Sequence, residues 1–146
     1  MTSLFPARQF DQIVEVLKTE EGFRSHGYRD SENNLSLGYG RCIEPSVGLG
    51  ITRDEATDLL ENDVFRSVEE CRRWGWFDTM NASRQSVLVQ LVFQMGLTKV
   101  RTFRKMIAIL ESEYPDYDLA ANELLDSKFA RQVPARAARL ARQLRN

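Results

Sequence analysis

The chain has 146 residues, a hydrophobic fraction of 42% and a formal net charge of −1. This length suits one domain or two small lobes, and the composition excludes a fibrous or disordered protein. The near-zero net charge gives no indication of a nucleic-acid partner, and no apolar run is long enough to cross a bilayer. The first residues lack the pattern of a secretory signal, so we expect synthesis in the cytosol and no membrane insertion.

The first predicted element is an amphipathic helix. Its apolar residues, Phe10, Ile13, Val14 and Leu17, recur at helical spacing. Gly22 is a typical residue for ending a helix, so Glu21 is expected at the helix end.

The next segment predicts a small antiparallel hairpin. Residues 30–34 are a strong turn signal, and residues 35–40 alternate large apolar with small side chains, as in a strand. After a Pro- and Gly-containing loop, residues 52–55 form a capping box that begins a long helix.

The remaining chain predicts helices throughout. Residues 83–95 leave almost no polar face, which is typical of the buried centre of a helical domain. Further helices are expected over 100–110 and 119–129, and a last one begins at Pro134. The element order predicts a mainly α protein with a minor β lobe.

Three polar residues stand where the first helix and the hairpin meet. Glu21 ends the helix, Asp30 opens the turn and Ser36 lies on the small-residue face of the strand. Two carboxylates that flank a cleft are what glycoside hydrolysis requires. Acids near turns are more often caps or solvated charges, however, so the pattern alone leaves both interpretations open.

Residues 17–22, followed by residues 28–30, resemble the catalytic opening of the phage-type lysozymes. In that family a catalytic Glu precedes a Gly, an Asp follows nine positions later and a Thr six positions after that. Glu21, Asp30 and Ser36 keep both spacings, with Ser in place of Thr. The resemblance implies that these three are the catalytic residues.

Two segments further along the chain also resemble the family. Residues 92–96 are similar to the end of its central helix, where a Gln lies near the substrate cleft. Residues 133–139 are similar to its Pro-x-Arg-x-x-Arg segment, whose first Arg pairs with the catalytic Glu. The resemblance therefore implies substrate-binding roles for Gln94 and Arg136.

The resemblance implies a single α+β, mainly α domain with the lysozyme-like fold. The expected parts are a small antiparallel β lobe at about 22–51, a larger helical lobe from 1–21 and 74–146, and a connecting helix at 52–73.

The implied function is peptidoglycan hydrolysis during bacterial lysis. The expected bond is the β-1,4 linkage between N-acetylmuramic acid and N-acetylglucosamine, with Glu21 as general acid and Asp30 and Ser36 orienting a water for inversion. We expect no metal or other cofactor, a monomer, and synthesis in the host cytoplasm with a separate export route to the wall. A lytic transglycosylase and a non-catalytic peptidoglycan-docking module remain alternatives.

One departure from the family suggests a structural ion pair. The family often has a His after its Gly-x-Gly strand that pairs with an Asp on the long helix. This sequence has Arg41 and Asp63 there, so we expect an Arg41–Asp63 pair between the lobes. In that layout Cys42 and Cys71 lie too far apart for a disulfide, and both are expected to be free thiols.

For three other features the sequence favours a role outside catalysis. The basic side chains from Lys128 onward are expected to form a solvated face that also attracts the anionic wall. His26, the only histidine, is expected on the surface, and Trp74 and Trp76 are expected to pack between helices.

Overall fold

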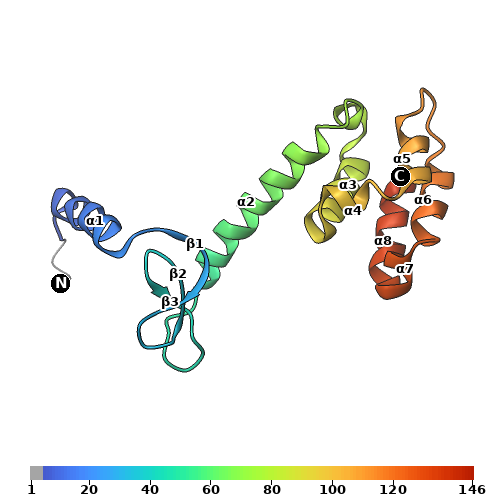
Figure 1. The fold of residues 1–146 in the computed structure, drawn as a ribbon. Helices are drawn as coiled ribbons and strands as arrows, with labels where there is room; N and C mark the ends of the chain where they lie inside the picture. Colours follow the sequence, from blue (N-terminus) through green and yellow to red (C-terminus); the bar gives the residue numbers. More distant parts are fainter. Residues whose placement is uncertain (1–4) are drawn as a thin grey trace. The chain divides into compact units, whose positions relative to one another are not determined.

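The computed structural model describes residues 5–146 and confirms a mainly α fold with a small antiparallel sheet (Figure 1). The chain divides into two compact units, one extending to Ala56 and the other running from Thr57 to Asn146. This boundary falls inside the helix that the sequence predicted as a connector. The finer lobe boundaries stay a prediction.

The first unit begins with helix α1, Ala7–Glu21. Gly22 ends it as predicted: the glycine has φ +71° and its N–H donates to the Lys18 carbonyl at 3.1 Å. The apolar residues Phe10 and Leu17 remain exposed, because α1 buries no residue.

A three-stranded antiparallel sheet follows, with the order β1–β2–β3. Its strands are β1 (Arg24–Arg29), β2 (Leu35–Gly38) and β3 (Arg41–Cys42). Tyr28 pairs with Ser36 across the first two strands, and Ser36 pairs with Cys42 across the last two. The predicted hairpin is thus confirmed and extended by a short third strand.

Helix α2, Arg53–Cys71, starts at the predicted capping box and continues into the second unit. The Glu55 N–H donates to Thr52 Oγ1 at 3.1 Å, and the Thr52 N–H donates to Glu55 Oε2 at 3.2 Å. These reciprocal bonds satisfy two donors that the first helical turn leaves without partners.

The second unit is helical and holds the main core. Helix α3, Ala82–Met95, supplies four of the buried side chains, Val87, Leu88, Leu91 and Val92, as its apolar sequence predicted. Helix α8, Pro134–Arg145, buries Leu140 and Leu144. Trp74 is 9% exposed and Trp76 packs against the core, so the predicted packing role of the two tryptophans is confirmed.

In two places the sequence predicted a continuous helix where the structure has a break. The helix expected over 100–110 begins later: residue 100 ends α4 (Leu97–Val100), and α5 (Arg104–Glu111) starts only at Arg104. The segment expected over 119–129 consists of α6 (Tyr117–Leu125) and α7 (Lys128–Gln132). In the second case the cause is local, because the Ser127 hydroxyl accepts from the Ala130 N–H at 3.1 Å and begins a new helix.

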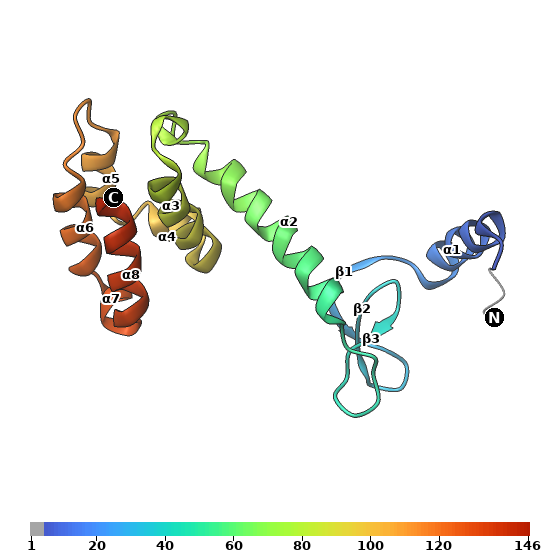
Figure 2. The same ribbon diagram turned by 180° about the vertical axis from the view of Figure 1, so that it is seen from behind.

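Helices α6, α7 and α8 lie side by side in both ribbon views (Figure 2). Both cysteines are free, as expected, with Cys71 in the core and Cys42 half-buried. Among the helices of residues 5–146, none has the length and apolarity that a membrane span requires.

Candidate active site

Glu21 reaches the sheet from the end of α1. Its carboxylate lies against the backbone of Gly40, which precedes β3: a Cβ at Gly40 would stand 3.1 Å from Glu21 Oε2. Gly40 has φ +79°, a conformation that L side chains rarely adopt. The glycine therefore serves both the tight turn between β2 and β3 and the close approach of the glutamate.

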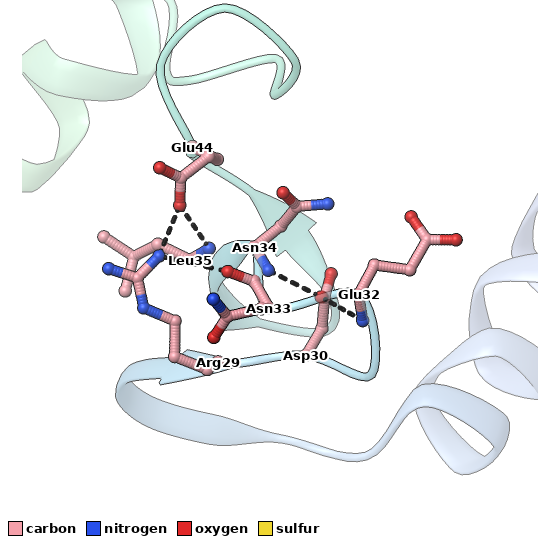
Figure 3. Close-up of polar contacts among 7 residues, drawn as sticks. All are labelled: Arg29, Asp30, Glu32, Asn33, Asn34, Leu35 and Glu44. Atoms are coloured by element: carbon pink, nitrogen blue, oxygen red, sulfur yellow. Dashed lines mark hydrogen bonds and ion pairs between the residues drawn. The ribbon is translucent and has the colours of Figure 1, made fainter.

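Asp30 opens the turn between β1 and β2 and also holds it together (Figure 3). Its Oδ1 accepts from the N–H groups of Glu32 and Asn34, each at 2.9 Å. Its own N–H donates to the Asn34 carbonyl at 2.9 Å, and Asn33 takes the positive φ of 63° that the turn needs. Within residues 5–146 Oδ2 has no hydrogen-bond partner, so half of the carboxylate is free for other chemistry.

Ser36 is 2% exposed and stands in the middle strand. Cross-strand partners share a face of a sheet, so Ser36 lies on the same face as Tyr28 and Cys42. Asp30 follows directly after β1, at the start of the turn that joins β1 to the strand of Ser36. In the described part of the chain the Ser36 hydroxyl makes no hydrogen bond to protein, which leaves it available to hold a water.

Arg41 has a different partner from the one predicted. Its Nη1 donates to Glu55 Oε2 at 2.8 Å and its Nη2 to Glu55 Oε1 at 3.1 Å, while Nη1 also donates to the Gly50 carbonyl at 3.0 Å. The capping box holds Glu55 in the first turn of α2, whereas Asp63 lies eight residues further along, about 12 Å at the rise of an α-helix. In the structure Glu55 is thus the partner of Arg41, and the predicted Arg41–Asp63 pair, whose members belong to different units, stays a prediction.

The charges of this pair affect each other. The hydrogen bond and charge of Glu55 raise the pKa of the Arg41 guanidinium. Conversely, the hydrogen bond from Arg41, and then the one from the Thr52 backbone, lower the pKa of Glu55 below its ordinary 4.5. The pair is thus ionised over a wide pH range.

The other predicted substrate-binding residues belong to the second unit. Gln94 is an exposed residue of α3 and Arg136 is a half-buried residue of α8, both in the second unit. Their roles in substrate binding stay predictions. His26 is exposed on β1, as expected, and shares a 2.8 Å hydrogen bond with Ser25 Oγ.

Glu44 is not among the residues that the sequence predicted for the site. Its Oε2 accepts from Arg29 Nη1 at 2.5 Å and from the Leu35 N–H at 2.8 Å (Figure 3). No local pattern announces these bonds, because the glutamate stands nine residues after Leu35, in a loop whose path the sequence does not specify. Within residues 5–146, no group of three or more His, Cys, Asp or Glu side chains is arranged to hold a metal ion.

A mainly α protein with a helix-end glutamate, and with an aspartate and a nearly buried serine on the hairpin that follows, has the fold class and residue pattern of the lysozyme class of glycoside hydrolases. The family model described as phage lysozyme matches residues 18–141, so the chain belongs to the phage lysozyme family. It is accordingly a lysozyme, a hydrolase of peptidoglycan.

Individual relatives agree with this assignment. The chain is 26% identical to "Probable T4-type lysozyme 2" of Dictyostelium discoideum, over 88% of the chain and 90% of the relative. "Probable T4-type lysozyme 1" of the same organism is 25% identical over the same shares. The chain is also 28% identical to "Pre-baseplate central spike protein Gp5" of Enterobacteria phage T4, where 88% of the chain matches 26% of the longer protein.

Proposed function

We propose that the chain cleaves the β-1,4 bond between N-acetylmuramic acid and N-acetylglucosamine, with inversion at the anomeric carbon, to lyse bacteria. The observation that carries this proposal is Ser36, a residue only 2% exposed whose hydroxyl has no hydrogen bond within residues 5–146 and so stays accessible to water. It shares a hairpin with Asp30, one of whose oxygens is free. A hydroxyl and a carboxylate oxygen without protein partners on one hairpin suit the binding of one attacking water.

In the proposed reaction Glu21 is the proton donor. Its proton passes to the glycosidic oxygen as the bond from that oxygen to the anomeric carbon breaks. The water held by Asp30 and Ser36 attacks the anomeric carbon from the opposite face and gives its proton to Asp30. Each product then carries a hydroxyl group, and the configuration at the anomeric carbon is inverted.

Other parts of the proposal rest on the resemblance to the family. These are the contacts of Gln94 and Arg136 with the glycan, and passage from the host cytoplasm to the wall by a separate export route. The basic side chains of α8, among them Arg136, Arg139 and Arg142, are of the right charge to attract an anionic wall.

The proposal is tested by digesting purified peptidoglycan and identifying both the products and their first anomer. Mass spectrometry should find reducing ends that incorporate water, and NMR at early times should find the α-anomer. Anhydro ends would instead identify a lytic transglycosylase, and the β-anomer would show retention. No products from folded protein would favour a docking module.

Matched variants assign the proton donor. Glu21→Gln should abolish product formation, because an amide is far too weak an acid to protonate the glycosidic oxygen. Glu20→Gln removes the neighbouring exposed carboxylate of α1 and should leave activity near that of the parent. Full activity in Glu21→Gln would contradict the proposed mechanism.

A further inference from the structure

Glu44, a carboxylate outside the proposed catalytic set, fastens both ends of the loop that carries Asp30. Its Oε2 accepts from Arg29, the last residue of β1, and from Leu35, the first residue of β2. Arg29 and Leu35 are themselves cross-strand partners. A single oxygen atom therefore closes the loop of residues 30–34 at its base (Figure 3).

The side chain of Glu44 supplies a hydrogen-bond acceptor that the short strand β3 does not supply. The Leu35 carbonyl accepts from the Ile43 N–H at 2.8 Å, but β3 ends at Cys42 and offers no backbone acceptor to the Leu35 N–H. Leu35 is half-buried, and a buried donor without a partner is costly. The Glu44 carboxylate supplies the missing acceptor.

The hydrogen bonds continue from this anchor to Asp30. Arg29 Nη1 also donates to the Asn33 carbonyl at 3.2 Å, and the Asn33 N–H donates to the Asp30 carbonyl at 2.9 Å. On the other side of the loop, the N–H of Asn34, the neighbour of Leu35, binds Asp30 Oδ1 at 2.9 Å. A shift of Arg29 or Leu35 is thus passed on to both the backbone and the carboxylate of Asp30.

Glu44 also binds and neutralises the charge of the Arg29 guanidinium. The guanidinium belongs to the residue that precedes Asp30, and its bond to Glu44 is a charge-assisted one.

We propose that Glu44 is a positioning residue for Asp30, acting through Arg29 and the Leu35 N–H to fix the turn that orients the attacking water. This inference rests on the proposed function, because the position of Asp30 affects the rate only if Asp30 acts in the reaction.

The kinetic test compares Glu44→Ala with Glu44→Gln on a defined soluble peptidoglycan fragment. Glu44→Ala should lower kcat about 10- to 100-fold, as expected for a displaced catalytic group. Its KM should stay within about twofold, because no substrate contact is removed. Glu44→Gln keeps an amide oxygen as acceptor for both donors and should recover kcat to within about threefold of the parent.

A control variant removes a comparable ion pair elsewhere. Glu69→Ala breaks the 2.8 Å pair with Arg72 on α2 and should leave kcat unchanged. If Glu44→Ala does not fold, Arg29→Met replaces it, since it removes one of the two bonds to Glu44 and should still lower kcat.

A second readout is independent of activity. The amide NMR signals of Glu32 and Asn34, whose N–H groups bind Asp30 Oδ1, should move in Glu44→Ala and return toward their parent positions in Glu44→Gln. The same signals should not move in Glu69→Ala.

The outcomes separate this inference from the proposed function. No cleavage by the folded parent protein would overturn the proposed function, and the positioning role with it. The positioning role alone would be overturned if the parent cleaves peptidoglycan and folded Glu44→Ala has the same kcat as the parent. If Glu44→Ala does not fold, the same result in Arg29→Met would overturn it. Equal losses of kcat in Glu44→Ala and Glu44→Gln would also overturn it, because Gln retains the acceptor.

Discussion

The Glu21 carboxylate rests against Gly40, and a Cβ on that glycine would lie 3.1 Å from Glu21 Oε2. Gly38, two residues earlier, has a similar backbone, with φ +66° against +79° for Gly40. No atom lies within 4 Å of the place that a Cβ on Gly38 would take. The two glycines therefore share a backbone requirement and differ only in the contact with Glu21.

Alanine at these two positions should separate backbone strain from crowding of Glu21. Both Gly38→Ala and Gly40→Ala should lose about 1–2 kcal/mol of stability, because each places a side chain in the left-handed region. Only Gly40→Ala should also lower kcat, by about tenfold, since it pushes the carboxylate from its place. Thermal unfolding and peptidoglycan hydrolysis measure the two effects. Equal kcat values in the two variants would mean that the contact does not govern the action of Glu21.

The Arg41–Glu55 pair should make stability depend on pH at the acid end. Arg41 lowers the pKa of Glu55 in the folded chain, so the carboxylate holds its proton less tightly there than in the unfolded chain. Its contribution is therefore full above the ordinary value of 4.5 and is lost as the pH falls through the lower folded value. The difference in unfolding free energy between parent and Glu55→Gln should shrink over that range.

Urea denaturation between neutral pH and pH 3 would measure this difference. Glu55→Gln is a clean variant, because Gln at this position keeps the capping box with Thr52 and removes only the charge. Asp63→Asn is measured in parallel, and the Arg41–Glu55 pair predicts that the change appears in Glu55→Gln. The opposite result, a change for Asp63→Asn alone, would restore the partner that the sequence suggested.

Local features of the fold could be predicted from the sequence because their causes are local. The end of α1 at Glu21 depends on one glycine, and the capping box depends on residues three positions apart. The apolar composition of α3 likewise sufficed to predict a buried helix. The break at Ser127 was missed, because a serine inside an apolar pattern does not by itself indicate whether it caps a new helix.

The candidate site shows the same division between local and distant causes. The spacing of Glu21, Asp30 and Ser36 is visible in the sequence, because it depends on one helix end and one hairpin. The partner of Arg41 depends on where a loop of ten residues delivers the start of α2, and spacing does not determine that. Glu44 was missed for the same reason, because the path of its loop decides whether its carboxylate reaches the Leu35 N–H, and spacing does not determine that path.

The two cysteines should differ in reactivity. Cys71 is 0% exposed, and burial, followed by the charge of Glu70, raises the pKa of its thiol to about 12. A thiol that stays protonated is a poor nucleophile, so an aromatic disulfide reagent near pH 8 should label only half-buried Cys42 in the folded chain. Both thiols should react in denaturant, and Cys42→Ser should abolish labelling of the folded protein. Rapid labelling of folded Cys42→Ser would contradict the burial of Cys71.

Gly48 should be intolerant of any side chain, because its loop folds back onto β3. A Cβ there would lie 2.5 Å from the Cys42 carbonyl oxygen and 2.8 Å from the Glu44 backbone nitrogen. Backbone atoms cannot rotate away as a side chain can, so Gly48→Ala should cost about 1–3 kcal/mol, as overpacking does.

Gly75→Ala is the matched control for this change, since nothing lies within 4 Å of its Cβ position. It should leave stability unchanged or raise it by up to about 1 kcal/mol through the unfolded chain. The same experiment also tests the anchor of the Asp30 turn, because a shifted Glu44 backbone should move the amide signals of Glu32 and Asn34. Gly48→Ala with parent-like unfolding and unmoved amide signals would contradict the close packing of this loop on β3.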